Sequence, residues 1–215
     1  MVFHVLNRGN DRRALFEQGS DFAAFLRVMR ETQERVDMRI LAYCLMPNHW
    51  HLLLWPEEDG ALAAFLQRLT TTHVRRWHLH HQTVGHGHLY QGTYKSFPVE
   101  DDVHFYTVAR YVERNALRAN LAPTAEQWRW GSLAQRSGQQ HVDESPKLSD
   151  WPVARPRNWS ARVNEPQTQQ ELDAIRLSVQ RGRPFGSVAW QRETAEQLGL
   201  EFTLNPRGRP RKASA

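Results

Sequence analysis

Apolar and polar positions follow an ordered series over the first 135 residues. Short apolar or alternating runs bounded by turn residues predict four β-strands, at residues 2–8, 38–46, 49–55 and 91–99. Apolar residues at helical spacing predict helices over 21–36, with Ser20 as the N-cap, over 60–81 and over 101–120. This order is that of a ferredoxin-like βαββαβ unit with one helix added. We therefore predict an α+β fold, with a single antiparallel sheet and helices on one of its faces.

The pattern changes after residue 135. Residues 136–165 are polar and rich in proline, with little periodicity, which predicts a linker or an extended arm on the domain surface. Short helices are predicted over 168–181 and 187–198. The chain is thus expected to consist of a main domain at 1–135, this arm, and a C-terminal helical segment at 166–215 that ends in a basic tail.

The charge of the chain is uneven. Its formal net charge is +5, with an isoelectric point of about 9.8. The last eleven residues, NPRGRPRKASA, carry Arg207, Arg209, Arg211 and Lys212 and no acidic residue. Lysine and arginine bind nucleic acids through the release of counterions, so this balance favours a phosphate-rich partner. PRGRPRK is similar to the core of an AT-hook, which lies in a minor groove, but a disordered solubilising tail fits the composition as well.

Neither a membrane protein nor a disulfide-bonded one is indicated. No apolar run approaches the roughly 18 residues that span a bilayer, and the N-terminal sequence lacks a signal-peptide pattern, so a cytoplasmic location is expected. The single cysteine, Cys44, lies in an apolar predicted strand and is interpreted as a small buried hydrophobe.

Two histidines, His49 and His51, lie in the apolar segment MPNHWHLLLW. Successive side chains of a strand point to opposite faces, so both imidazoles share one face, about 6 to 7 Å apart. Neutral imidazole is the commonest metal ligand in proteins, so this pair can hold a divalent cation. On its own the pair fits two ordinary half-buried residues at a strand edge at least as well.

Tyr111 and Asn115 are four residues apart in RYVERN, so they lie on one face of the third predicted helix. A tyrosine becomes a useful nucleophile beside a bound cation and a polarised phosphate, and an asparagine can offer its amide oxygen to a metal. Without the histidines, these residues fit a surface aromatic and a residue near the end of a helix. Tyr106 is turned roughly 140° away on the same helix, so both tyrosines cannot face the histidines.

The ordered set of segments HVLNRGNDRRALF, MPNHWHLLLW, HLYQGTYKSFPV, RYVERN and RGRPFG with NPRGRPRK resembles the HUH class of single-tyrosine transposases. In particular it resembles the REP-associated tyrosine transposases of bacteria, over nearly the whole chain. The resemblance implies the ferredoxin-like fold, with the histidine strand at its centre and the tyrosine helix packed against the histidines. It also implies that residues 1–135 are the catalytic domain of a cytoplasmic, nucleoid-associated protein.

Residue by residue, the resemblance implies that His49 and His51 are metal ligands, Asn115 a third ligand and Tyr111 the nucleophile. The implied cation is Mg²⁺ or Mn²⁺. The implied reaction is attack of the tyrosine on a DNA phosphodiester, which gives a 5′-phosphotyrosine link and a free 3′-hydroxyl. The covalent link keeps the bond energy for rejoining, so no nucleotide cofactor is expected. Family members often have a proline after the asparagine, whereas this chain has Ala116, which allows the helix to continue.

The implied partner is single-stranded DNA with REP-type hairpins, and neither a membrane nor a small-molecule substrate is expected. Candidate DNA-binding residues share a positive charge and a place after the first strand, near the expected active face or in the tail: Arg8, Arg12, Arg13, Lys95, Arg114, Arg118, Arg207, Arg209 and Arg211. Each of them could instead form an ordinary salt bridge. The resemblance leaves the oligomeric state open and favours a monomer, because relatives with a long C-terminal arm act as monomers.

Six further histidines crowd the second helix and the loop after it: His73, His78, His80, His81, His86 and His88. No cysteine accompanies them, and their spacings fit no standard structural zinc site. We interpret them as contacts to DNA or as surface residues.

Two other functions fit the same residues. A DNA-hairpin-binding protein without strand transfer would use the basic residues alone, and the intact pair of histidines with Tyr111 argues against it. A metal-dependent hydrolase would use activated water, and a stable protein–DNA adduct would exclude it.

Overall fold

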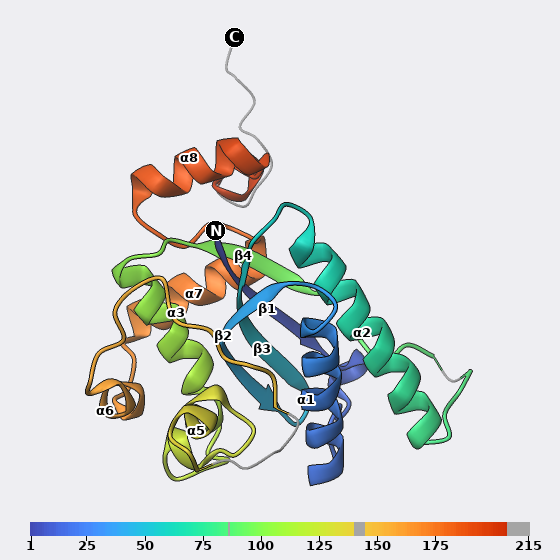
Figure 1. Cartoon of the computed structure of the whole chain (residues 1–215). Helices are drawn as coiled ribbons and strands as arrows, with labels where there is room; N and C mark the ends of the chain where they lie inside the picture. The colour runs from blue at the N-terminus through green and yellow to red at the C-terminus, as the bar shows by residue number, and fades with distance from the viewer. Residues whose placement is uncertain (86, 140–144, 206–215) are drawn as a thin grey trace.

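Four β-strands form one antiparallel sheet at the centre of the molecule (Figure 1). The computed structural model describes residues 1–85, 87–139 and 145–205, so the predicted tail arginines Arg207, Arg209 and Arg211 lie outside the described residues. The strands lie in the order β2-β3-β1-β4 and comprise β1 (Val2–Arg8), β2 (Met38–Met46), β3 (His49–Pro56) and β4 (Lys95–Val99). All three pairs are antiparallel, which is the arrangement of the ferredoxin-like fold. The predicted α+β fold is confirmed.

Two long helices, α1 (Gly19–Gln33) and α2 (Ala61–His80), cover one face of the sheet. Both were predicted, with small differences at their ends. Helix α1 begins before Ser20, because Gln18 is the N-cap and the carboxylate of Asp21 accepts a hydrogen bond from the backbone N–H of Gln18 in a capping box.

The other face is covered by α3 (Val103–Glu113), α6 (Trp159–Asn164) and α7 (Gln169–Arg181) (Figure 1). The prediction of helices on one face only was therefore wrong. The reason lies in β2 and β3, which are apolar on both sides and so bury both. Cys44 points into this second layer, where burial raises the pKa of its thiol to about 12, as expected of an inert buried residue.

Two predicted elements differ from their observed form. The fourth strand begins only at Lys95, because the residues before it form a loop in which Tyr90 bridges to Gly9. The third helix is divided at Arg114 into α3 and the short α4 (Asn115–Arg118).

Helices α7 and α8 (Val188–Leu198) were both predicted. The remaining elements are short: η1 (Asn10–Arg12), η2 (Ala125–Gln127), α5 (Ser132–Arg136) and η3 (Glu201–Thr203). No helix in the described parts of the chain has the length and apolar character needed to cross a membrane.

The segment from residue 145 to α6 lies along β2 and α3 rather than free of the domain. Leu148 pairs with Ile40, so this segment covers the edge of the sheet at β2. Further along, the buried Trp159 donates a hydrogen bond of 2.6 Å to Glu113 on α3, and Ser132 donates a second one of 2.6 Å. Burial raises the pKa of Glu113, while the two donors favour its charged form.

Candidate active site

His49 and His51 lie on the central strand β3 and face the layer that contains α3. Their ring centroids are 5.0 Å apart with the ring planes at 84°. His51 is 3% exposed and His49 is half-buried. The strand therefore brings both imidazoles to one place, as the alternation of the sequence predicts.

Both rings are held in the neutral state. Burial, with smaller contributions from the charges of Arg8 and Arg118, lowers the pKa of His49 to about 4. Burial likewise holds the pKa of His51 well below its ordinary value, with smaller contributions from the neighbouring histidines and arginines. A neutral imidazole has a lone pair for a metal, so at pH 7 neither ring must lose a proton in order to bind one.

Each histidine also uses its Nδ1 atom for a hydrogen bond. His49 Nδ1 is 2.6 Å from Asn48 Oδ1, and His51 Nδ1 is 3.0 Å from His4 Nε2. The Nε2 atoms of the pair are the ones that stay available to a ligand. Hydrogen bonds at the second ring nitrogen are the usual way in which proteins orient metal-binding histidines.

Tyr111 lies on α3 and is 8% exposed. The centroid of its ring is 5.7 Å from that of His51, with the planes at 88°. Tyr106 is turned away from the histidines, and its hydroxyl donates a 2.6 Å hydrogen bond to the backbone oxygen of Ala154. Of the two tyrosines on α3, Tyr111 is therefore the one that faces the histidine pair.

Asn115 and Arg118 continue the same helical face. Asn115 is 3% exposed, and its Nδ2 donates to the backbone oxygen of Tyr111 at 3.4 Å. Its Oδ1 accepts a 2.7 Å hydrogen bond from Arg118 Nη2, and the Arg118 guanidinium lies 4.3 Å from the centroid of the Tyr111 ring. An amide oxygen has two lone pairs, so one is left for a metal.

His4 is the site residue that sequence reasoning missed. It lies on β1, is 0% exposed, and is in hydrogen-bond contact with His51. The two rings are within 8° of parallel, and burial lowers the pKa of His4 to about 3, so this contact joins two neutral rings. The sequence signal was a histidine within the apolar strand VFHVLNR. This signal can be connected to His51 only when the pairing of β1 with β3 is known.

A basic pocket of about 340 Å³ lies next to the histidines. Arg8, which is opposite His49 in the β1–β3 pairing, and Lys95 give this pocket its positive charge. The Nε of Arg8 and the Nη1 of Arg118 are buried and have no hydrogen-bond partner within the described residues. Unpartnered guanidinium donors are suited to the oxygens of a phosphate.

The other predicted DNA-binding residues lie farther from the pair. Arg12 and Arg13 are exposed after β1, and Arg13 lies over the ring of Trp77, 5.9 Å from its centroid. The structure does not bring Arg114 to the histidines, because its Nη1 donates to the backbone oxygens of Val163 and Asn164 at the end of α6.

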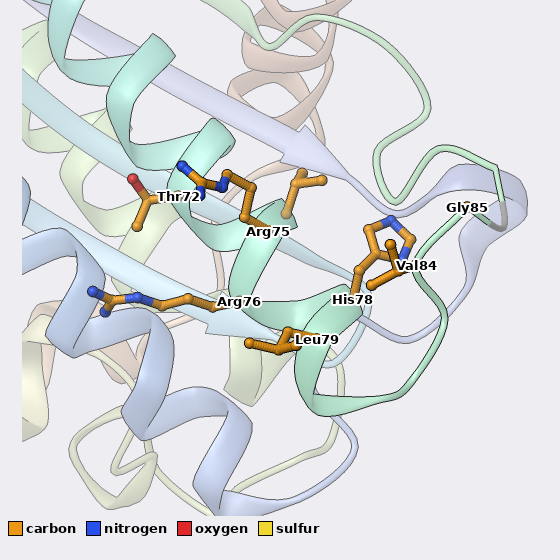
Figure 2. Close-up of a pocket in the computed structure, with 8 residues that line it drawn as sticks. Thr72, Arg75, Arg76, His78, Leu79, Val84 and Gly85 are labelled. Carbon is orange, nitrogen blue, oxygen red and sulfur yellow. The ribbon is translucent and has the colours of Figure 1, made fainter.

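A larger pocket, of about 590 Å³, lies on the opposite layer of the fold (Figure 2). It is formed by the C-terminal half of α2 and the following loop, with Arg75, Arg76, His78 and Val84 among its lining residues. None of the residues that surround Tyr111 contributes to it. The pocket beside Arg8, by contrast, adjoins the candidate active site.

Residues 1–115 match the family model described as IS200-like transposase. The chain belongs to this family. The matched stretch is more than half of the chain, and it contains the histidine pair, Tyr111 and Asn115. No protein with a curated description matches this transposase.

Two solved structures are similar to this transposase. One is a REP-associated tyrosine transposase bound to a REP hairpin, with 13% identity and a TM-score of 0.48, over 70% of this chain and 87% of that one. The other is a Deinococcus radiodurans R1 protein described as a transposase, with 17% identity and a TM-score of 0.41, over 53% of this chain and 88% of that one.

Proposed function

We propose that this transposase cleaves and rejoins single-stranded DNA next to REP-type hairpins through a 5′-phosphotyrosine intermediate. The observation that carries the proposal is the position of the Tyr111 ring against His51, with Arg118 over its face. One chain supplies both the histidine pair and the tyrosine, so a monomer would be a complete active unit. The sequence motifs shared with REP-associated transposases support the choice of hairpin DNA.

The proposed step is an in-line displacement at phosphorus. Tyr111 Oη attacks the phosphodiester, loses its proton to solvent and forms the phosphotyrosine bond. The bond from phosphorus to the 3′-oxygen breaks, and that oxygen leaves as a hydroxyl after it takes up a proton. Arg8 and Arg118 would donate their unpartnered N–H groups to the non-bridging oxygens, where negative charge develops. The reverse attack by a 3′-hydroxyl rejoins the strand.

The histidine pair fits a divalent cation. Both Nδ1 atoms are engaged in hydrogen bonds, and both rings are neutral, so His49, His51 and the Asn115 oxygen would hold Mg²⁺ or Mn²⁺. A cation there would draw charge from the non-bridging oxygens of the phosphate.

The proposal is tested with a labelled DNA hairpin from the chain's own genome, extended by single-stranded flanks and incubated with protein and Mg²⁺ or Mn²⁺. The expected product is a protein–DNA band that resists denaturation and forms only with metal. DNA that is cut without an adduct would indicate hydrolysis by activated water instead. Hairpins that bind and are never cut would favour a structural or regulatory DNA-binding protein.

Substitution of His4 tests the hydrogen bond behind His51. His4→Phe removes the partner of His51 Nδ1, so we expect the affinity for Mn²⁺ to fall by about 10- to 100-fold. Isothermal titration calorimetry of the purified protein measures this affinity, and a thermal melt checks that the variant is folded. His4→Gln retains an acceptor and is expected to lose less. Equal affinity of wild type and the folded His4→Phe variant would contradict this role.

Substitution of Arg8 tests the basic pocket. Arg8→Ala is expected to weaken the binding of single-stranded DNA and to reduce the slope of log K against log salt by about 0.7, the value for one phosphate contact. Fluorescence anisotropy at several salt concentrations gives both quantities. Arg35→Ala, at an exposed position just after α1, is the matched control and should leave the slope unchanged. The same slope in all three proteins would exclude Arg8 from the DNA path.

A further inference from the structure

A group of three metal-binding side chains lies on the layer opposite Tyr111. Asp21 is at the start of α1, and His80 and His81 are at the end of α2. One ligand atom from each residue lies within 4.8 Å of the others. We propose that Asp21, His80 and His81 form a second metal site, which takes a transition-metal ion such as Zn²⁺ and fixes the end of α2 to the start of α1.

The carboxylate of Asp21 is held in place with one oxygen to spare. Asp21 is 7% exposed, and its Oδ2 accepts hydrogen bonds from the backbone N–H groups of Glu17 at 2.8 Å and Gln18 at 3.0 Å. The other oxygen, Oδ1, lies 3.5 Å from His81 Nε2. The capping interaction of α1 therefore orients a ligand atom toward the histidine at no further cost in side-chain freedom.

The ring of His81 is likewise fixed. It stacks on Trp77, with the ring centroids 4.2 Å apart and the planes at 23°. Its Nε2 is buried without a hydrogen-bond partner in the described chain. The 3.5 Å gap to Asp21 is long for a hydrogen bond, but it is close to the separation of about 3.4 Å between two ligands of a tetrahedral zinc with bonds of about 2.0 to 2.1 Å.

His80 completes the set from the solvent side. Its ring centroid is 5.1 Å from that of His81, and the planes are at 89°. A cavity of about 150 Å³ adjoins the three residues and has room for a water molecule in the fourth position. Two imidazole nitrogens and one carboxylate oxygen are a common ligand set for zinc. The charged carboxylate of Asp21 distinguishes this site from the one proposed beside Tyr111, where the oxygen ligand is the neutral amide of Asn115.

The positive charge of Arg76, at the edge of this site, is offset by a carboxylate. Arg76 lines the cavity, but its guanidinium forms two hydrogen bonds, of 2.7 and 3.0 Å, with the carboxylate of Glu31 on α1. Figure 2 shows Arg76 reaching from α2 across the neighbouring α1 ribbon. The charge of Arg76 is therefore offset by Glu31, and the negative charge of Asp21 remains available to a bound cation.

An ion at this site would also fix one end of the loop that follows α2. That loop returns to the end of β1, where the backbone N–H of Gln91 donates to the backbone oxygen of Arg8 at 3.0 Å. It supplies Gln91, Gly92 and Thr93 to the basic pocket. The second site would thereby stabilise the wall of that pocket from a distance.

The experiment uses the full-length His49→Ala protein, in which the half-buried ligand of the candidate active site is removed. We expect one Zn²⁺ per chain by calorimetry, no competition from Mg²⁺, and a visible absorption band typical of tetrahedral Co²⁺ when Co²⁺ is the probe. Adding His80→Ala should weaken Zn²⁺ binding by roughly tenfold or more and reduce the rise in Tm that Zn²⁺ produces. His80 is exposed, so the folded state of this variant does not depend on its side chain.

The matched control is His104→Ala. His104 lies in another group of three, with Glu100 and Asp102, but its Nδ1 is already 2.8 Å from Asp102 Oδ1, and Glu100 accepts from Ser187. That substitution should leave Zn²⁺ affinity unchanged. The proposal is overturned if His49→Ala binds no Zn²⁺, or if His80→Ala and His104→Ala affect binding equally.

Discussion

Tyr111→Phe is expected to abolish the covalent protein–DNA adduct while DNA binding persists. Phenylalanine keeps the ring that contacts His4, His51 and Arg118, and it removes only the hydroxyl. Loss of a nucleophile costs several orders of magnitude in rate, so adduct formation should fall by roughly 10⁴-fold or more. Denaturing gels with labelled hairpin DNA measure the adduct, and anisotropy measures binding.

Tyr106→Phe is the matched control for this experiment. It removes a hydroxyl from the same helix, on the side where it bonds to the backbone oxygen of Ala154, away from the histidines. We expect normal adduct formation from this variant. An adduct of undiminished yield from Tyr111→Phe would place the nucleophile elsewhere and remove the basis of the proposed mechanism.

The second large effect is a loss of stability in acid. Burial lowers the pKa of His4 and of His73 to about 3 each, below the 6.5 of an unfolded chain. Between pH 6.5 and 3 the unfolded chain binds protons that the folded chain does not, so stability falls as the pH falls, by about 1.4 kcal/mol per pH unit for each histidine. From pH 6 to 4.5 the two histidines would together remove about 4 kcal/mol, a large part of a typical folding free energy.

The geometry around His73 explains why it stays neutral. Trp50 Nε1 donates to the hydroxyl of Tyr90 at 3.0 Å, and that hydroxyl donates to His73 Nδ1 at 2.7 Å. Burial raises the pKa of Tyr90, so the hydroxyl keeps its proton and has the neutral His73 Nδ1 as its acceptor. A proton on His73 Nδ1 would leave the buried hydroxyl of Tyr90 without this acceptor for its own proton.

Urea unfolding from pH 7.5 to 4.5 measures this loss of stability. The Gln side chain of His73→Gln can still accept from Tyr90. The free energy of unfolding of this variant should fall less steeply than that of the wild type, by about 1.4 kcal/mol less per pH unit. His88→Ala, at an exposed position, should follow the wild-type curve. If His73→Gln also follows that curve, the buried histidine does not govern acid stability.

The fold followed from the sequence where one local pattern decided the outcome. The Pro47-Asn48 turn and the apolar runs on either side of it were enough to define β2 and β3. The sequence could not show which faces of the sheet the helices cover. Leu41 and Leu53 on one side of the sheet are as apolar as Ile40 and Leu52 on the other. Only the packing of α3, α6 and α7 shows that both sides are buried.

Spacing along a single element was enough to predict which of the candidate site residues lie together. His49 with His51, and Tyr111 with Asn115, are pairs within one strand and one helix. His4 could not be found in this way, because His4 and His51 lie on different strands and are 47 positions apart in the sequence. Arg114 and Arg118 are both close to Tyr111 in sequence, and the turn of the backbone decides that only Arg118 reaches the tyrosine ring.

The buried carboxylate of Glu113 holds α3, and with it Tyr111, in place. Glu113 is two residues after Tyr111 on the same helix, and its carboxylate accepts hydrogen bonds from Ser132 and Trp159. Both donors lie beyond the residues that match the family. A rotation of α3 that moved the Tyr111 side chain would have to break both hydrogen bonds to Glu113. The position of Tyr111 therefore depends on Ser132 and Trp159, which lie outside the residues that match the family.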